Sequence, residues 1–177
     1  AHAHVCLWLG RLSLLTKVDP WPTYQLLQRL AADLRQPLWL IECGPDDTPE
    51  QGRHFAELRQ LCPDVHFLRL GGAEPVDEAT KHQALAAADV ALSLVDNCQE
   101  TFGLSVIEAM AAGLPVVASD WDGYRDSIRH GIDGFLVPTR WAPGSAACSF
   151  PLGWQQQLEL LSFPMVSGAL AQLVQLD

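Results

Sequence analysis

The chain has 177 residues, 49% of them hydrophobic, and a formal net charge of −10 at pH 7. This length suffices for one well-filled domain, or for one domain with an appendage. The excess of acidic residues argues against nucleic acids and anionic membrane surfaces as partners, so any bound phosphate must be held by local groups.

Short apolar runs alternate with helical patterns along most of the chain. The runs that predict strands span residues 5–9, 38–41, 65–70, 90–95, 115–119 and 135–137. Apolar residues at helical spacing predict helices over residues 22–34, 49–61, 75–88, 104–113 and 124–130. Strands that are almost wholly apolar are typical of parallel sheets covered on both faces. The sequence therefore predicts a doubly wound, Rossmann-like α/β fold with about six parallel strands and helices on both faces.

Polar stretches follow three of the predicted strands, at residues 10–17, 70–74 and 96–103. The carboxyl ends of parallel strands meet at one edge of a sheet, and ligands bind in the crevice outside that edge. We therefore expect one cleft rather than three separate sites.

The composition changes after residue 139. Residues 141–151 are rich in Pro, Gly, Ser and Ala and predict a loop, whereas residues 154–161 and 165–176 have helical apolar spacing. We divide the chain into a ligand-binding Rossmann-like domain, residues 1–140, and a loop and helical extension, residues 141–177. We expect this extension to be truncated and the chain to be part of a longer protein.

The five cysteines are scattered and lack C-x-x-C spacing, which is typical of reduced thiols in a cytosolic protein. No signal-peptide pattern opens the chain, and no apolar run approaches the roughly 20 residues of a membrane helix. We expect a cytoplasmic protein without a transmembrane segment. Because the histidines and cysteines show no ligand spacing, we also expect no metal and no other cofactor.

Residues 96–113 combine three features of a ligand site. The start of the predicted helix offers unpaired backbone N–H groups and a partial positive charge, which suit an anion. Gly103 lets a ligand approach the backbone closely. Glu108 lies in an otherwise apolar helix, where a buried carboxylate needs a partner such as a pair of ribose hydroxyls. Taken alone, Glu108 is explained as well by an open flank or by the helix dipole.

Three segments resemble the carboxyl-terminal domain of retaining glycosyltransferases with the two-domain GT-B fold. They read A-A-A-D-V-A-L-S-L at 86–94, Q-E-T-F-G-L-S-V-I-E-A-M-A-A-G-L-P-V-V-A-S-D at 99–120 and H-G-I-D-G-F-L-V-P at 130–138. Glu100 and Glu108 have the Glu-x7-Glu spacing that marks this family. The resemblance covers about residues 5–140 and implies one half of a GT-B fold, without the amino-terminal acceptor-binding domain.

The resemblance also implies how the diphosphate and the sugar of a nucleotide-diphospho-sugar donor are bound. The segment G-R-L-S at 10–13, followed by Lys17, is similar to the family's diphosphate-binding segment, so Gly10, Arg11 and Lys17 would hold the diphosphate. Glu100 would be the catalytic residue, facing the donor sugar. The loop at residues 70–72 would lie beside the base.

At the predicted helix start, the resemblance implies contacts through the backbone. Phe102 and Gly103 would donate N–H groups to sugar hydroxyls, and Leu104 and Ser105 would do so to phosphate. Glu108 would accept hydrogen bonds from the ribose. Two departures stand out: Val18 follows Lys17 where the family has glycine, and D-G-Y-R-D at 122–126 stands where Gly-Gly-x-x-Glu is expected.

The implied function is the donor-binding domain of a retaining, metal-independent glycosyltransferase that transfers a hexose from a UDP- or GDP-sugar to an unknown acceptor. Without its acceptor domain, this portion of the enzyme would be inactive. The alternative is a non-catalytic GT-B-like binding or scaffold domain. A dinucleotide-binding oxidoreductase would need G-x-G-x-x-G after the first strand, where this chain has G-R-L-S-L-L.

Overall fold

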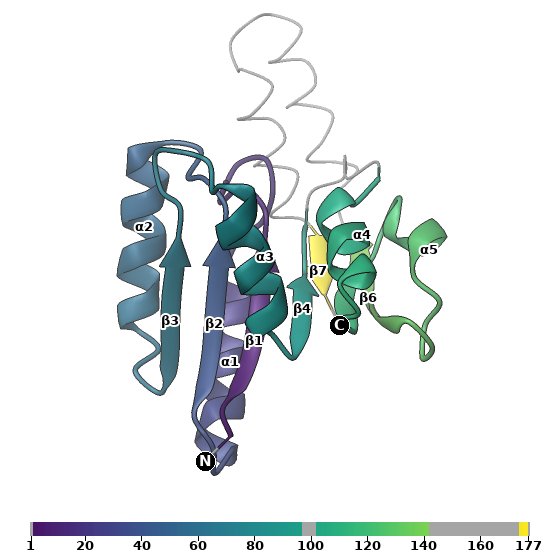
Figure 1. Cartoon of the computed structure of the whole chain (residues 1–177), viewed down its shortest axis with the longest axis horizontal. Coiled ribbons are helices and arrows are strands. Elements are labelled where there is room, and N and C mark those ends of the chain that lie inside the picture. The colour runs from purple at the N-terminus through teal and green to yellow at the C-terminus, as the bar shows by residue number, and fades with distance from the viewer. Residues whose placement is uncertain (1, 97–101, 142–173, 177) are drawn as a thin grey trace, which may run out of the picture.

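The structure, a computed structural model, describes residues 2–96, 102–141 and 174–176. Helices cover both faces of a single sheet, with α3 and α4 in front of it and α1 behind it in Figure 1. The strands are β1 (His4–Leu9), β2 (Leu38–Cys43), β3 (Val65–Leu70), β4 (Val90–Ser93), β5 (Val116–Asp120), β6 (Gly134–Trp141) and β7 (Val174–Leu176). The helices are α1 (Trp21–Asp33), α2 (Pro49–Gln60), α3 (Glu78–Ala87), α4 (Leu104–Ala111) and α5 (Tyr124–Ser127).

The strands follow the order β3-β2-β1-β4-β5-β6-β7, and β1 to β6 are parallel. This arrangement confirms the predicted doubly wound α/β fold. The order of the strands reverses between β1 and β4, and ligands of such sheets bind at this switch point. In the described part of the chain, no helix is both long enough and apolar enough to cross a membrane.

The end of the chain differs from the helix predicted over residues 165–176. Val174–Leu176 form β7, which pairs antiparallel with β6 from Thr139 to Trp141. Strand β6 extends beyond the predicted residues 135–137 and would otherwise form the edge of the sheet. Its backbone N–H and C=O groups need hydrogen-bond partners, and β7 supplies them. Residues 142–173 lie outside the described residues, so the division of the chain at residue 140 stays a prediction.

Alternation along each strand divides the apolar side chains between two cores. In β1, Trp8 packs with Tyr24 and Phe55 beneath α1 and α2. Leu7 points to the other face, where it packs with residues such as Val106 of α4. Burial on both faces explains why the strands read as nearly continuous apolar runs.

A buried carboxylate ties the sheet to the helices behind it. Glu42 of β2 is fully buried. The Tyr24 hydroxyl of α1 donates to Glu42 Oε1, and Arg59 Nε of α2 donates to Glu42 Oε2 at 2.8 Å. Burial raises the pKa of Glu42, and the charge of Arg59 opposes that rise. The ion pair with Arg59 thus favours the charged form of Glu42, which burial disfavours.

We predict that Arg59→Met lowers the free energy of unfolding by about 3 kcal/mol, because it removes the ion-pair partner of the buried Glu42 carboxylate. Urea denaturation at pH 7 measures this loss. Arg53→Met is the matched control in the same helix, because its pair with Glu50 is exposed and its loss should leave the urea midpoint nearly unchanged. The double variant Glu42→Gln/Arg59→Met should recover part of the loss. Equal losses for Arg59→Met and Arg53→Met would contradict the prediction.

Candidate functional site

Glycines bring the ends of β1, β2 and β3 into direct backbone contact. The Gly10 N–H donates to the Cys43 carbonyl at 2.9 Å, and the Gly44 N–H donates to the Leu70 carbonyl at 3.0 Å. A Cβ atom on Gly44 would lie 2.1 Å from the Gly10 oxygen, and one on Gly71 would lie 2.3 Å from the Gly44 oxygen. Such distances exclude a side chain at either position. The edge of the sheet at these strand ends is therefore formed by backbone.

Arg11, a predicted diphosphate-binding residue, is held by the loop after β2. Its Nη1 atom lies 3.0 Å from Asp47 Oδ1, and its Nη2 atom donates to Thr16 Oγ1 at 3.3 Å. Asp47 Oδ2 accepts a further hydrogen bond from the Ser13 hydroxyl at 2.9 Å. The sequence analysis missed Asp47, which ends the turn G-P-D-D at residues 44–47 and does not stand out there from other turn residues. The pair fixes the position of the guanidinium group, which still has further N–H donors for a ligand.

Lys17 lies in the same loop, where its backbone N–H donates to the Ser13 carbonyl at 3.0 Å. The N–H of Val18 donates to the same carbonyl, also at 3.0 Å. Val18 stands where the family has glycine, and its side chain is buried in the core beneath α1 and α2. The departure from glycine thus has a packing reason: the turn keeps an ordinary backbone conformation and buries an apolar side chain.

The loops after β1 and β4 meet at the switch point. Asp96 Oδ2 accepts a hydrogen bond from the Asp19 N–H at 3.0 Å. The other carboxylate oxygen, Oδ1, is buried and has no hydrogen-bond partner within the described residues. The polar stretch at residues 70–74 contacts the loop after β2, whose Asp46 N–H donates to the Gly72 carbonyl at 2.7 Å. The same loop contacts the loop after β1, because the Leu12 N–H donates to the Pro45 carbonyl at 2.8 Å. These contacts connect described residues of the loops after β1, β2, β3 and β4, and the single cleft expected at this edge stays a prediction.

Gly103 starts α4 in the left-handed conformation, with φ 63° and ψ 48°, and no side chain caps the helix. A Cβ atom at Gly103 would lie 2.3 Å from the ring of Tyr124, whose hydroxyl forms a hydrogen bond with the Ser93 hydroxyl at 2.7 Å. The first helical residues, Leu104 and Ser105, precede the first backbone N–H groups that bond to Gly103. The N–H groups of Leu104 and Ser105 therefore have no partner within α4, as is usual in the first turn of a helix.

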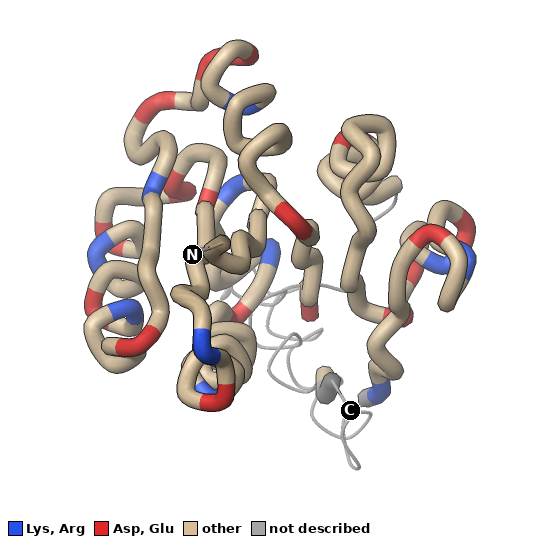
Figure 2. Tube along the Cα trace, turned by 60° about the horizontal axis from the view of Figure 1, so that its bottom comes forward, with Lys and Arg blue, Asp and Glu red and all other residues tan. Residues whose placement is uncertain are grey.

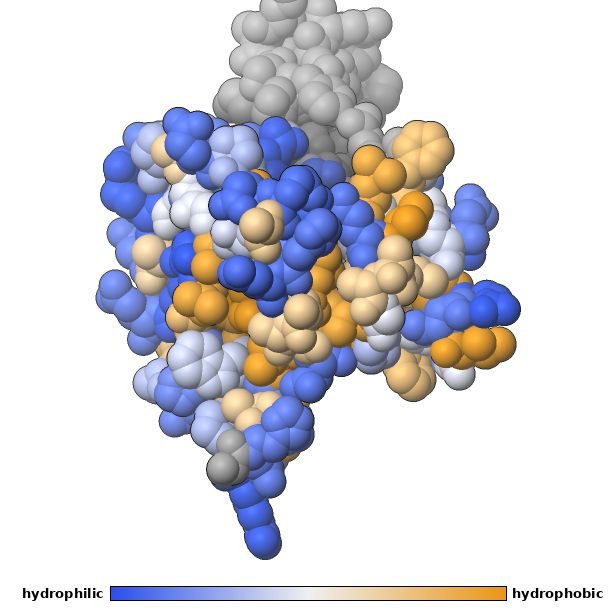
Figure 3. Space-filling view, in the orientation of Figure 1, coloured by the Kyte–Doolittle hydropathy of each residue, from blue (hydrophilic) through white to orange (hydrophobic). Residues whose placement is uncertain are grey.

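Phe102 and Leu104 flank this helix start with exposed side chains, 69% and 68% accessible. Hydrophobic surface over α4 is visible in Figure 3. The sequence analysis assigned both residues a role through their backbone, and the structure leaves their side chains outside the core.

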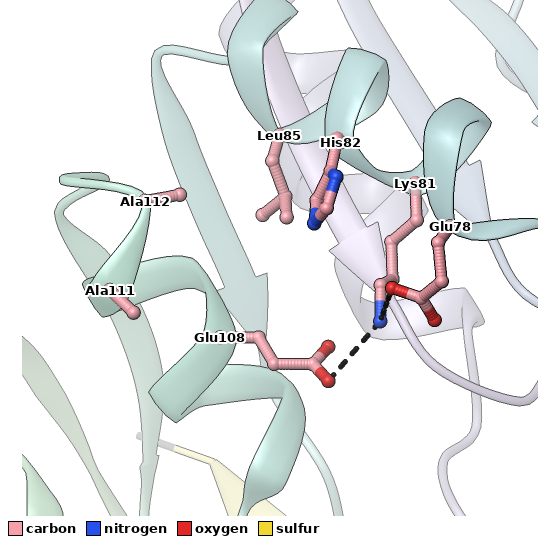
Figure 4. A pocket seen from close by; sticks show the side chains of 7 residues that line it. All are labelled: Glu78, Lys81, His82, Leu85, Glu108, Ala111 and Ala112. Atoms are coloured by element: carbon pink, nitrogen blue, oxygen red, sulfur yellow. Dashed lines mark hydrogen bonds and ion pairs between the residues drawn. The ribbon is translucent and has the colours of Figure 1, made fainter.

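Glu108 lies one turn into α4 and forms an ion pair with α3. Its Oε1 atom is 3.3 Å from Lys81 Nζ, which is also 2.9 Å from Glu78 Oε2 (Figure 4). The Glu108 side chain is 45% exposed, so the carboxylate is on an open flank rather than in the core. The sequence analysis missed Lys81, which the pattern of α3 presented only as one polar position among several.

Glu100, the predicted catalytic residue, lies outside the described residues, so its placement relative to Glu108 stays a prediction. Among the residues that the structure describes, no group of three or more His, Cys, Asp or Glu side chains is arranged to hold a metal ion. The expectation of metal-independent chemistry is likewise still a prediction.

The model of the family described as "Glycosyl transferases group 1" matches residues 16–147. The chain belongs to the glycosyl transferases group 1 family. The match includes Lys17, Glu100 and the whole of α4, whereas Gly10 and Arg11 precede it.

Curated relatives of this group 1 chain include a phosphatidyl-myo-inositol mannosyltransferase of Mycobacterium tuberculosis, 48% identical over 134 residues, which covers 62% of this chain and 35% of the relative. A D-inositol 3-phosphate glycosyltransferase of Corynebacterium glutamicum is 32% identical over 158 residues, covering 82% of this chain and 35% of the relative. The chain thus spans about a third of the length of these relatives.

Solved glycosyltransferase structures share the fold of this group 1 chain. Anabaena Alr3699/HepE, in complex with UDP and glucose, is 26% identical with a TM-score of 0.56, covering 97% of this chain and 42% of that chain. The carboxyl-terminal domain of a group 1 protein (LpcC) from Francisella tularensis is 18% identical with a TM-score of 0.55, covering 96% of this chain and 84% of that chain. These likenesses confirm the predicted fold class, one half of a GT-B fold.

Gly103→Ala should destabilise this group 1 domain by more than Gly113→Ala, its matched control. Both residues have positive φ, 63° and 84°, but a Cβ atom at Gly113 meets nothing within 4 Å. We expect roughly 1–2 kcal/mol of backbone strain in each variant, and an additional loss from the Tyr124 ring in Gly103→Ala alone. Thermal or urea unfolding measures both. Equal losses would show that the ring does not restrict this position.

Asp96→Asn should stabilise the domain at pH 7 by about 2 kcal/mol. Burial raises the pKa of Asp96 to about 6, although the Asp19 N–H opposes the rise. The folded state therefore binds more protons than the unfolded state between about pH 4 and pH 6, and stability falls as the pH rises through that range. Urea denaturation from pH 4 to 7.5 should show the advantage of Asp96→Asn growing with pH. A difference independent of pH would refute this.

Proposed function

We propose that this chain is the donor-binding domain of a retaining glycosyltransferase that transfers a hexose from a nucleotide-diphospho-sugar. The observation that carries the proposal is the meeting of the loops after β1 and β4 at the switch point of the sheet, through Asp19 and Asp96. This contact joins the loop that carries Arg11 and Lys17 to Asp96, just after the end of β4. Membership of the glycosyl transferases group 1 family supports a sugar-transfer reaction at this edge of the sheet.

In this proposal, local groups hold the diphosphate. The chain carries a net charge of −10, and its Lys and Arg residues are spread over several elements rather than gathered on one face (Figure 2). Arg11, Lys17 and the N–H groups of Leu104 and Ser105 would supply the positive field that the whole molecule lacks. As the bond to the sugar breaks, the same groups would stabilise the charge developing on the departing nucleoside diphosphate.

We further propose that these groups balance the diphosphate without a metal ion. Glu100 would be the catalytic residue, orienting the sugar hydroxyls and balancing positive charge at the anomeric carbon. Glu108 would accept hydrogen bonds from the ribose. The complex of Alr3699/HepE with UDP and glucose supports a uridine nucleotide and a hexose as the first donor to test, and the mannosyltransferase relatives also support a hexose.

The acceptor would be bound by a second domain that this chain does not contain, so the chain alone would bind the donor and transfer little sugar. The group 1 relatives are about three times as long as the matched region, which supports this division of labour. A non-catalytic scaffold domain is the competing function, and such a domain would not need the ribose carboxylate.

Calorimetric titration of the chain with UDP, GDP and ADP in the presence of EDTA tests the proposal. We expect one of the three to bind, and Glu108→Ala to weaken its binding by about 10- to 100-fold, because hydrogen bonds to a charged group are lost. The matched control is Glu57→Ala, which removes an exposed acid from α2 and should leave binding unchanged. If none of the three nucleotides binds at millimolar concentration, the proposed function is wrong.

A further inference from the structure

A hollow of about 370 Å³ lies between α3 and α4. It is lined by Glu78, Lys81, His82, Leu85, Glu108, Ala111 and Ala112 (Figure 4). Both helices follow parallel strands, so their amino-terminal ends lie toward the carboxyl edge of the sheet, and Lys81 and Glu108 each stand about one turn from such an end. The charges of Lys81 and Glu108 also act on Cys43, the last residue of β2. The charged end of the hollow therefore borders the candidate site.

Lys81 is held between two carboxylates. Its Nζ atom lies 2.9 Å from Glu78 Oε2 and 3.3 Å from Glu108 Oε1, and its side chain is only 19% exposed. Hydrogen bonds to Glu78 and then to Glu108 raise the pKa of Lys81, so it is a cation at neutral pH. The Lys81 side chain is thus fixed along its length and cannot sample many rotamers.

The ion pair leaves half of the Glu108 carboxylate open. Lys81 contacts Oε1, while Oε2 makes no hydrogen bond or ion pair with any described residue. A glutamate on an exposed helix flank ordinarily moves among several rotamers, and ordering it on binding a ligand costs free energy. The contact with Lys81 orders the side chain before any ligand arrives.

We propose that Lys81 is a positioning residue for nucleoside recognition, holding Glu108 so that its open oxygen accepts hydrogen bonds from the ribose hydroxyls. This inference rests on the proposed function, because Glu108 has a ribose to bind only if the domain takes a nucleotide. Lys81 acts through Glu108 and touches no reacting atom. If Lys81 served only to hold α3 against α4, it would make the same contacts. It would then have no effect on the preference for a nucleotide with ribose over one that lacks the ribose hydroxyls.

Calorimetry with UDP and with 2′,3′-dideoxyuridine diphosphate, or with the guanosine pair if GDP binds instead, separates these roles. The protein should prefer the ribonucleotide, and Lys81→Met should weaken its binding by roughly 3- to 10-fold, the cost of ordering one free side chain. The ratio of the affinity for UDP to the affinity for the dideoxy ligand should fall in the same variant. The reason is that Lys81→Met disturbs the hydrogen bonds from Glu108 to the ribose hydroxyls, which only UDP can form. Lys81→Arg keeps a cation between the carboxylates and should restore most of the preference.

Arg129→Met is the matched control. It removes one cation from an exposed pair with Asp133, just before the amino end of β6 and so at the opposite edge of the sheet. It should change neither affinity nor preference. Thermal melting verifies that each variant is folded, and Lys81→Gln replaces Lys81→Met if the latter is not.

The possible results separate the two proposals. If Lys81→Met weakens both ligands equally, Lys81 contributes only charge or stability and the inference is overturned. Tighter binding of UDP by Lys81→Met would also overturn it, since Lys81 would then mask Glu108. If the unaltered protein binds none of these nucleotides, the proposed function fails and the inference fails with it. Clear nucleotide binding with an unchanged preference in Lys81→Met would leave the proposed function standing and remove only the role of Lys81.

Discussion

The left-handed turn at Gly103, packed against the ring of Tyr124, is the constraint on which the candidate site depends. No Cβ atom fits between the backbone and the ring, and the Tyr124 hydroxyl is anchored on Ser93 at the end of β4. This contact fixes where α4 begins relative to the sheet. The start of α4 in turn fixes the direction of the N–H groups of Leu104 and Ser105 and, one turn later, the place of Glu108 opposite Lys81. The segment that is richest in family residues is thus positioned by an aromatic residue that lies outside it in sequence.

Partners from neighbouring elements hold the polar groups around the switch point. Asp47 of the β2–α2 loop binds Arg11, Lys81 of α3 binds Glu108, and the Asp19 N–H binds Asp96. Each contact joins segments that are far apart in sequence. In an acidic protein such pairs let a few cations stay ordered at the edge of the sheet, where an anionic ligand meets groups that are already oriented. The glycine contacts beneath them keep side chains away from the edge and leave it open to a ligand.

Much of the fold was predictable because its signals are local. Apolar runs bounded by glycine and proline located six strands, and their lack of alternation indicated a sheet buried on both sides. The strand β7 was not predictable in this way. Val174–Leu176 fitted the helical spacing of the preceding residues, and only pairing with the extended edge of β6 made them a strand. The sequence analysis did not identify Asp47 and Lys81 for a similar reason. An acid in a turn and a lysine on a helix are ordinary until their partners are known.

The sequence by itself indicated the family and the order of strands and helices from β1 to β6, and it picked out Arg11, Lys17, Gly103 and Glu108 as candidate site residues. These features depend on residue type and spacing, which the chain carries whether or not it is folded. Only the tertiary structure decided which charges meet. Arg11 pairs with Asp47, and Glu108 with Lys81, because parallel strands bring successive loops and helices to one edge of the sheet. An ion pair requires that two charged atoms lie within a few ångströms of each other, and the separation of two residues along the chain does not determine that distance.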